Sequence, residues 1–357
     1  MSAPRKFELE NRGLFDRLFE PPAVGKMTVT AKIVAYTLLI TWSIFVIFPI
    51  YWVVVTSFKL PQHVNEGPVF LPFIDFWPSL HAWEALLVTD FGDTLRAYIN
   101  SIVIGVASTA LCIVIGSMAA YALARIEYRP KLGSILLFVA LLVIATVVTG
   151  TMGIPWQVTM PVAFGVFLFL LRALGRRFKA RLGNGDILFW IISQRILPPI
   201  VVIIPIYMMF QSVGLLDTHL GLILAYAVAN LPIVVWLMHD FFVGLPIELE
   251  ESAQLDGATR FRIFREIVVP LTKPGLAATT LLVLILCWNE YLLAVFLSTS
   301  KAQTMPILVA AMNAGDRGIL WWTMCVVIVV MILPVILMAV VLQRYIAKGV
   351  LLGAVKG

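Results

Sequence analysis

Two groups of polar residues interrupt long apolar stretches of this sequence. Arg195 lies within one stretch, and Trp288, Asn289 and Glu290 follow one another within another. Ionisable residues at membrane depth are candidates for function because burying an uncompensated charge is costly. A guanidinium offers five donors to a hydroxyl-rich or anionic substrate, and a tryptophan face beside an amide and a carboxylate suits a sugar ring. Arg195 could instead reach toward the membrane surface or form a structural pair, and Trp288 could belong to an interfacial aromatic belt.

The sequence carries none of the common catalytic motifs. It has no G-x-x-x-x-G-K-[ST] phosphate loop, no H-E-x-x-H pair, no G-x-S-x-G elbow and no histidine cluster. Cys112, Cys287 and Cys325 fall in apolar stretches without a C-x-x-C pair, which is typical of packing residues. We therefore expect a chain that is not an enzyme and binds no cofactor, with any ATP hydrolysis on a separate subunit.

A polar segment, ELEESAQLDGATRFRIFREIVVPLTKPG at 248–275, separates two apolar stretches. Its glutamates favour a helix start and Gly257 favours the end of that helix. A second short helix is predicted from Ala258 until Pro270 ends it. Apolar residues recur along it at helical spacing, namely Phe261, Phe264 and Val268. A hairpin this small has no core of its own, so the ridge predicts a surface that docks on another protein. Packing onto the protein's own helices is the alternative.

The composition places most of the chain in a bilayer. Hydrophobic residues make up 61% and charged residues 13%, and the mean hydropathy is +0.97, more apolar surface than a soluble domain can bury. A bilayer core needs about 20 apolar residues per helix. This length predicts about eight spans, near 33–58, 98–123, 132–152, 154–171, 187–210, 220–243, 276–297 and 319–342. The third and fourth are joined by a tight turn at Gly153 and Pro155 and could form one re-entrant hairpin instead.

The distribution of basic residues predicts the orientation. The first apolar stretch follows a basic head and has no A-x-A cleavage site, so we expect a retained anchor. With the amino terminus in the cytoplasm, four of the 26 Lys and Arg lie outside and one lies in a span, which leaves 21 on the cytoplasmic side. Five of these crowd into one loop: Arg172, Arg176, Arg177, Lys179 and Arg181. The net charge of +6 is therefore a feature of topology and does not indicate a nucleic-acid partner.

Small residues and prolines indicate how the spans pack. The second span repeats small residues every four positions, at Ser108, Cys112, Gly116, Ala120 and Ala124. Such a stripe lets another backbone approach closely and predicts a helix contact surface. Prolines at 198, 199, 232 and 334 are expected to break or kink their spans.

Residues 251–270 resemble the signature of permeases of ATP-binding cassette (ABC) importers, which is Glu-Ala-Ala, three residues, Gly, nine residues and Ile-x-Leu-Pro. The matching positions are Glu251, Ala253, Gly257, Ile267 and Pro270, with Asp256 beside the glycine. Ser252 replaces an alanine and Val269 replaces the leucine. The resemblance implies that the hairpin at 245–275 docks in a cleft of an ATPase subunit, where the glutamate meets a basic residue. Its role would be to transmit closure of the ATPases to the membrane helices.

Further segments resemble the carbohydrate branch of that family, in particular the second membrane subunit of maltose-type importers. They are NSIVIG at 100–105, AAYALAR at 119–125, the stretch 204–242, CWNEYLLA at 287–294 and the tail 343–357. The resemblance implies a sugar, oligosaccharide or polyol as substrate, and a location in the bacterial cytoplasmic (inner) membrane with both termini cytoplasmic. The implied partners are a second permease subunit, two ATPase subunits that hold ATP and Mg, and an extracytoplasmic substrate-binding protein.

The expected fold is an all-α polytopic membrane protein with a six-helix type I importer core. The family usually passes directly from one helix to the next where this chain has residues 131–186, so these are predicted to be an inserted transmembrane hairpin with a basic loop. The expected order is a cytoplasmic segment 1–32, two core spans with an outer loop 33–130, the insert, the remaining core spans 187–342 and a tail 343–357.

Two other functional classes remain open from the residues alone. An ion-coupled secondary transporter would need intramembrane acids and inverted repeats, whereas only Glu290 lies well inside a span and no convincing repeat is present. A scaffold without transport activity is favoured only by the insert.

Overall fold

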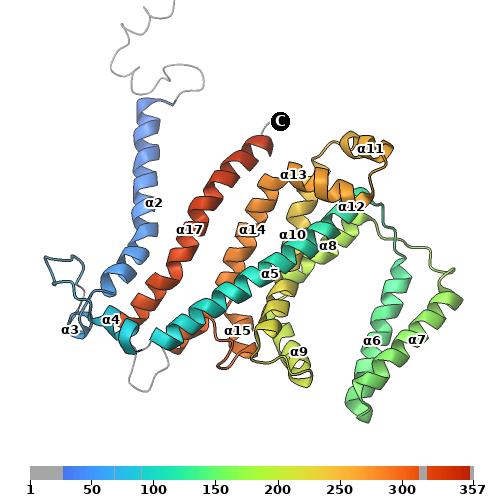
Figure 1. Cartoon of the computed structure of the whole chain (residues 1–357), viewed down its shortest axis with the longest axis horizontal. Coiled ribbons are helices and arrows are strands. Elements are labelled where there is room, and N and C mark those ends of the chain that lie inside the picture. The colour runs from blue at the N-terminus through green and yellow to red at the C-terminus, as the bar shows by residue number, and fades with distance from the viewer. Residues whose placement is uncertain (1–26, 68, 90, 313–319, 354–357) are drawn as a thin grey trace, which may run out of the picture. The chain divides into compact units, whose positions relative to one another are not determined.

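The computed structural model describes residues 27–67, 69–89, 91–312 and 320–353, which are predominantly helical (Figure 1). Six helices in these ranges are long and apolar enough to cross a bilayer: α2 (Val29–Thr56), α5 (Phe91–Arg125), α6 (Leu132–Met152), α7 (Trp156–Leu174), α10 (His219–Val243) and the apolar part of α17 (Trp321–Gly353). Two bent helix pairs raise the number to as many as eight. The prediction of an all-α polytopic membrane protein is confirmed. Most of the predicted segment 1–32 lies outside the described residues.

The stretch predicted as the fifth span is divided. α8 (Asn184–Ser193) and the 3-10 turn η2 (Gln194–Ile196) end before Leu197, and α9 (Pro199–Ser212) leaves at 90°. Leu197 is extended, with φ −67° and ψ 128°, because a residue before proline is kept out of the helical region. The two prolines at 198 and 199 therefore break this span.

The stretch predicted as the seventh span is divided as well. α14 (Lys273–Trp288) ends before Asn289, and the short α15 (Leu292–Leu297) follows. At its other end, α14 meets the segment 260–271 at 82°. That segment consists of α12 (Arg260–Ile263), the π-helical turn η3 (Phe264–Val268) and α13 (Val269–Leu271). α16 (Met305–Ala311) lies between α15 and α17 along the chain.

The chain forms two compact units, residues 1–92 with 311–330 and residues 93–310 with 331–357. In the first unit, α3 (Pro61–Asn65), α4 (His81–Glu84) and the π-helical turn η1 (Ala85–Thr89) follow α2. Lys59 fastens the loop after α2, since its Nζ donates to the Val69 carbonyl at 2.6 Å and lies 4.1 Å from the ring centroid of Trp52. Burial lowers the pKa of Lys59.

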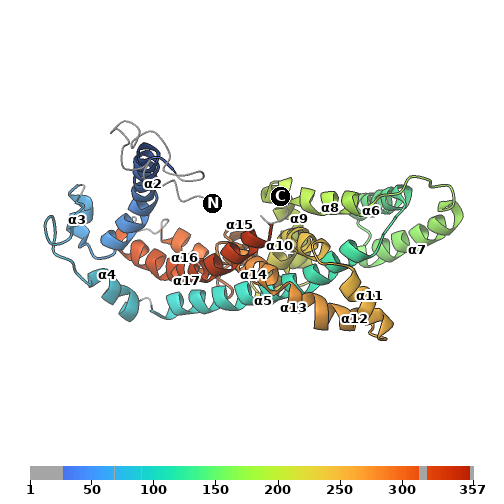
Figure 2. The ribbon, with the colours of Figure 1, turned by 90° about the horizontal axis from the view of Figure 1, so that it is seen from above.

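The core of the second unit surrounds α10, which packs against α8, α14 and α15. Its buried side chains include Leu222, Tyr226, Val234, Met238 and Phe242. α5 runs beside this core (Figure 2), and the predicted stripe of small residues on α5 is buried as far as Ala120. A Cβ at Gly116 would lie 2.6 Å from Cγ1 of Val234, and Cys112 Sγ lies 3.1 Å from the Ala227 carbonyl. The predicted contact surface is confirmed.

The insert folds as an antiparallel pair, α6 and α7. Gly153, with φ of +65°, ends α6, and Pro155 precedes α7. The helices have 21 and 19 residues, which is long enough for two separate crossings. The tail predicted from 343 is helical as far as Gly353, as part of α17.

Candidate coupling hairpin and intramembrane polar chain

The predicted hairpin begins with α11 (Glu248–Leu255) and turns at Gly257. Gly257 has φ of +81°, a conformation that residues with a side chain adopt at a cost, and no atom lies within 4 Å of where its Cβ would stand. Glycine is therefore required here by the backbone and not by space. Thr259 then caps α12, because its hydroxyl accepts from the Arg262 N–H at 3.3 Å.

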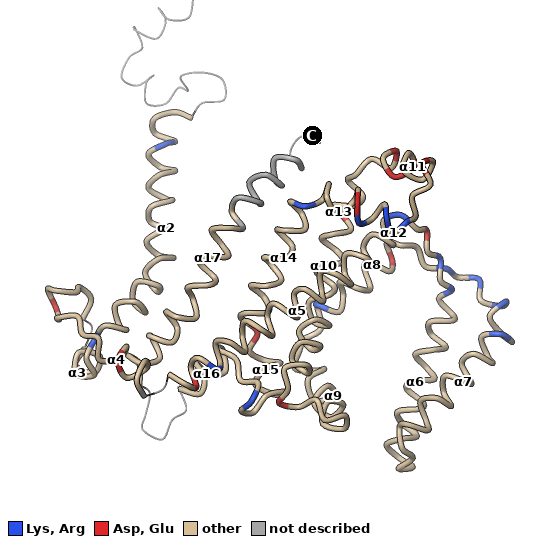
Figure 3. Tube along the Cα trace, viewed as in Figure 1, with Lys and Arg blue, Asp and Glu red and all other residues tan. Residues whose placement is uncertain are grey.

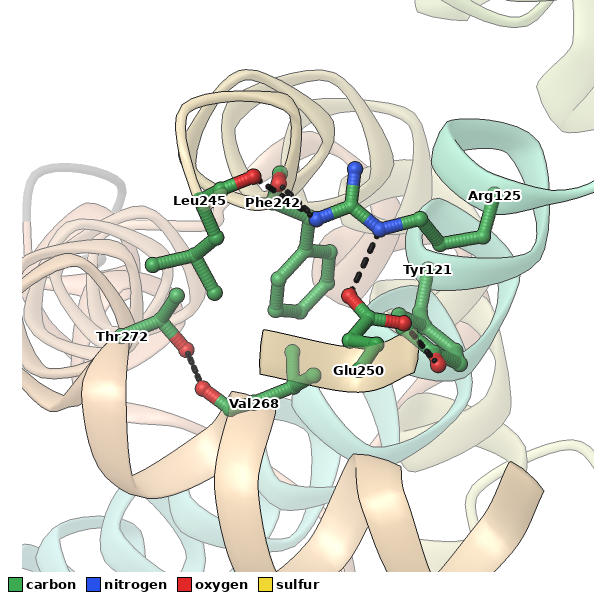
Figure 4. A network of polar contacts seen from close by, with 7 residues as sticks. All are labelled: Tyr121, Arg125, Phe242, Leu245, Glu250, Val268 and Thr272. Atoms are coloured by element: carbon green, nitrogen blue, oxygen red, sulfur yellow. Dashed lines mark hydrogen bonds and ion pairs between the residues drawn. The ribbon is translucent and has the colours of Figure 1, made fainter. Parts of the chain in front are cut away.

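A buried ion pair fastens the hairpin to the end of α5 (Figure 4). The Nε of Arg125 donates to one carboxylate oxygen of Glu250 at 2.6 Å, and the Tyr121 hydroxyl donates to the other at 2.7 Å. Arg125 also donates through Nη2 to the carbonyls of Phe242 and Leu245, at 2.9 and 3.1 Å. The side chains of the pair are only 7% and 2% exposed. Nothing in the sequence indicated this role of Glu250.

The neighbouring Glu251, the glutamate of the signature, points elsewhere. Its side chain is exposed, like that of Asp256, and within the described residues no side chain binds its carboxylate. Ala253 and Ile267 are half-buried and pack on the core, whereas Pro270 is exposed. The matched positions therefore divide between an inner and an outer side of the hairpin.

The predicted apolar ridge is also divided, which corrects its expected orientation. Val268 is fully buried, and Phe264 packs on Tyr121 with 5.1 Å between ring centroids. Phe261 remains 62% exposed and is joined on the surface by Leu255 at 90%. The π-helical turn η3 holds more residues per turn than the α-helix on which the predicted ridge was based. The outward apolar surface of the hairpin therefore consists of Leu255 and Phe261.

A second set of polar contacts crosses α10 and begins at Arg195, which is exposed. Arg195 donates from Nη2 to Asn230 Oδ1 at 2.9 Å, and the Asn230 amide donates to the Tyr226 carbonyl at 2.9 Å. The Tyr226 hydroxyl donates to the backbone carbonyl of Glu290 at 3.2 Å. Two of the four predicted pathway residues are thus linked through α10. Asn230 was missed, although an amide within an apolar span is itself a signal of a helix contact.

The other two pathway residues differ in exposure. Trp288 is 2% exposed, its Nε1 donates to the Met331 carbonyl at 3.1 Å, and the Tyr98 ring meets it edge-on with 5.6 Å between centroids. Asn289 is exposed and Glu290 half-buried, with a carboxylate oxygen of Glu290 accepting from the Leu293 N–H at 3.0 Å. The face of Trp288 is therefore covered by this chain, whereas Asn289 and Glu290 remain accessible.

At the opposite end of the second unit, Asp217 connects the turn before α10 with residues 299–302. Its carboxylate accepts four backbone N–H groups at 3.1 Å, from Thr299, Ser300, Lys301 and Ala302. Burial alone would raise the pKa of Asp217, but these four donors outweigh it and hold that pKa well below its usual range. Beside this turn, Asn100 donates to the Lys301 carbonyl at 2.9 Å and pairs with His219 Nε2 at 2.7 Å.

The long apolar helices with a polar hairpin between two of them define a polytopic membrane protein. Residues 29–352 match the model of the family described as binding-protein-dependent transport system inner membrane component. This protein therefore belongs to that family.

Several relatives of known description resemble the chain over nearly its whole length. It is 28% identical to a diacetylchitobiose uptake system permease of Streptomyces coelicolor, over 89% of this chain and 86% of the relative. It is 29% identical to a trehalose transport system permease of Mycobacterium tuberculosis, over 94% and 100%. A trehalose/maltose transport system permease of Thermococcus litoralis is 26% identical, over 89% and 94%.

A solved structure supports the fold. It is the crystal structure of a bacterial ABC transporter involved in the import of the acidic polysaccharide alginate. One of its chains superposes with a TM-score of 0.60 at 22% identity, and the match covers 94% of this chain and 98% of that chain.

Proposed function

We propose that this protein is a permease subunit of an ATP-driven importer for a sugar, oligosaccharide or polyol. The observation that carries the proposal is the hairpin at 248–275, which is anchored inside the chain through Glu250 and leaves Glu251, Leu255 and Phe261 free on its outer side. A carboxylate beside two exposed apolar side chains suits a cleft with a basic residue on an ATPase subunit. The diacetylchitobiose and trehalose permeases among the relatives favour a carbohydrate cargo.

The proposed mechanism is alternating access driven through the hairpin. Closure of two ATPase subunits, which hold ATP and Mg, moves α11 and α12. Glu250 passes the movement to α5 through Arg125 and Tyr121. α5 has 35 residues and is about 52 Å long by helical rise, so one rigid element carries the movement to the end near Asn100.

The proposed pathway runs along the polar contacts of α10. Arg195, Asn289 and Glu290 offer hydrogen bonds to substrate hydroxyls, and Trp288 supports them from the buried side. A second permease subunit completes the pathway, and an extracytoplasmic substrate-binding protein delivers the cargo. The assembly lies in the bacterial cytoplasmic membrane, with both termini and the hairpin of this chain in the cytoplasm.

The test compares two glycines with the same backbone requirement. Gly257 and Gly153 both have positive φ, +81° and +65°, and neither has an atom within 4 Å of a Cβ position. Valine at either site strains the backbone by about 1–3 kcal/mol. We expect Gly257→Val to lower retention of the ATPase subunits on the purified complex, and ATP-driven uptake into vesicles, by roughly tenfold, as about 1.4 kcal/mol would.

Gly153→Val is the matched control, because its turn joins α6 and α7 away from the hairpin. It should retain the ATPases as the wild type does. Equal retention and uptake in both variants would contradict the proposed coupling. Uptake that depends on an ion gradient and does not depend on ATP would favour a secondary transporter instead.

A further inference from the structure

The inserted pair α6 and α7 is almost uncovered by the rest of the chain. Within the described residues, Ala145 is the buried residue of α6 and Thr159 that of α7. The helices contact each other, with 5.1 Å between the ring centroids of Phe138 and Phe167. An apolar groove lies between them, lined by Phe138, Leu141, Leu142, Met160, Ala163 and Phe164. Its lining has neither a charge nor a side-chain hydrogen-bonding group.

The basic loop that follows α7 is held in place against the start of α6. The Leu132 N–H donates to the Ala180 carbonyl and the Leu182 N–H to the Pro130 carbonyl, both at 2.9 Å. A Cβ at Gly133 would overlap the ring of Phe178, so the aromatic side chain lies directly on the α6 backbone. The loop is thereby fixed at the end of the helix pair.

The last turn of α7 and this fixed loop together carry five exposed cations. Arg172, Arg176, Arg177, Lys179 and Arg181 are all exposed. In the part of the chain that the structure describes, no acidic side chain forms an ion pair with them. Figure 3 shows Lys and Arg gathered as blue segments at one end of α6 and α7, while most of both helices is tan.

The groove lies at the depth of lipid acyl chains below these cations. Its lining begins at Phe138, six residues after Leu132, and reaches Met160, fourteen residues before Leu174, which is about 9 to 21 Å by helical rise. One leaflet of a bilayer has a hydrocarbon layer about 15 Å thick. A molecule with an acyl tail and an anionic head therefore matches both features at once.

We propose that α6, α7 and the basic loop form a binding site for an anionic phospholipid. The acyl chain lies in the groove between the helices, and the headgroup phosphate is bound by the cations of the loop. A transmembrane helix of a partner subunit would cover the groove but would leave the five positive charges without partners. Basic residues between membrane helices attract anionic headgroups in this way.

The experiment uses the assembled complex in nanodiscs of phosphatidylcholine with phosphatidylglycerol, followed by native mass spectrometry of the retained lipid. Each cation near an anionic surface is worth about fivefold in affinity. The triple variant Arg176→Gln, Arg177→Gln and Lys179→Gln is therefore expected to bind phosphatidylglycerol on the order of 100-fold more weakly. Ala163→Trp fills the groove without changing the charge and is expected to reduce retention as well.

The matched control removes three exposed cations elsewhere, as Lys32→Gln, Arg96→Gln and Lys273→Gln. It should retain phosphatidylglycerol as the wild type does. Equal losses in the two triple variants would overturn the proposal, because general surface charge would then explain the lipid. Unchanged retention in Ala163→Trp, or a crosslink from position 163 to a partner helix, would also overturn it. If the loop variant does not fold, the retention of phosphatidylglycerol by Ala163→Trp alone tests the proposal.

Discussion

Glu250 and Glu251 are neighbours in the sequence, but their side chains have different surroundings. Glu250 is 1% exposed and is bound by Arg125 and Tyr121. Glu251 is exposed, about 100° further around the helix. Both residues fit the first turn of a helix equally well, so local sequence could not distinguish them. The signature resemblance singled out Glu251, whereas the burial of Glu250 depends on an arginine that the fold brings from 125 positions away.

The buried pair should contribute far more to stability than an exposed pair of the same hairpin. Removing one member of a buried, hydrogen-bonded pair costs about 3–5 kcal/mol, because it leaves the other charge unpaired. We expect Glu250→Gln and Arg125→Met each to lower the free energy of unfolding by that order. The double variant should cost much less than the sum of the two. Thermal unfolding of the purified protein in detergent measures all three.

The control is the pair of Arg262 and Glu266, which lie four residues apart with side chains 65% and 55% exposed. Removing either of them should cost about 0.3–0.5 kcal/mol. Losses of similar size for the buried and the exposed pair would show that Glu250 does not anchor the hairpin.

Helix contacts that depend on the local spacing of residues could be predicted from the sequence. Breaks within a helix could be predicted only in part, because they also depend on the neighbouring helices. The stripe on α5 repeats every four residues, and its members from Ser108 to Ala120 are buried as expected. The prolines at 198 and 199 predicted a break in this span, but the 90° angle between its two helices also depends on what α8 and α9 pack against. The π-helical turn η3 has no proline or glycine within it, so nothing in its sequence indicated that Phe261 would separate from Phe264.

Two helical glycines should respond oppositely to alanine. A Cβ at Gly116 would stand 2.6 Å from Val234 Cγ1, whereas nothing lies within 4 Å of that position at Gly150 on α6. We expect Gly116→Ala to destabilise the protein by about 1–3 kcal/mol through overpacking. Gly150→Ala should stabilise it by up to about 1 kcal/mol through helix propensity. Thermal unfolding of both variants checks the signs, and stabilisation by both would mean that α5 and α10 do not touch at Gly116.

At the scale of the molecule, carboxylates that are buried or half-buried connect distant segments at two ends of the second unit. Glu250 joins the hairpin to α5 and α10 at one end. Asp217 joins the turn before α10 to residues 299–302 at the other. The helical class and the family could be predicted from hydropathy and the signature, whereas two of the eight predicted spans are bent helix pairs in the structure. Neither set of contacts could be predicted, because each connects residues that are distant in the sequence.

The Asp217 contacts should make stability depend on pH in acid. The folded pKa of Asp217 lies below its unfolded value of about 3.9. Its contribution is therefore complete above the unfolded value and is lost as the pH falls through the folded value. We expect Asp217→Asn to cost about 1.5–3 kcal/mol at pH 7 and progressively less below pH 4, as measured by unfolding in detergent. Asp93→Asn, at an exposed site, is the control, and a cost for Asp217→Asn that is unchanged in acid would contradict this account.

The internal bonding of the hairpin also affects how an assembly of this kind is built. Because Tyr121 and Arg125 hold α11 in position within this chain, the proposed docking surface is already preorganised without a soluble subunit. A preorganised surface loses little conformational entropy on association. If the hairpin docks as proposed, the membrane subunit can fold first, in the bilayer, and bind the ATPase subunits afterwards without refolding.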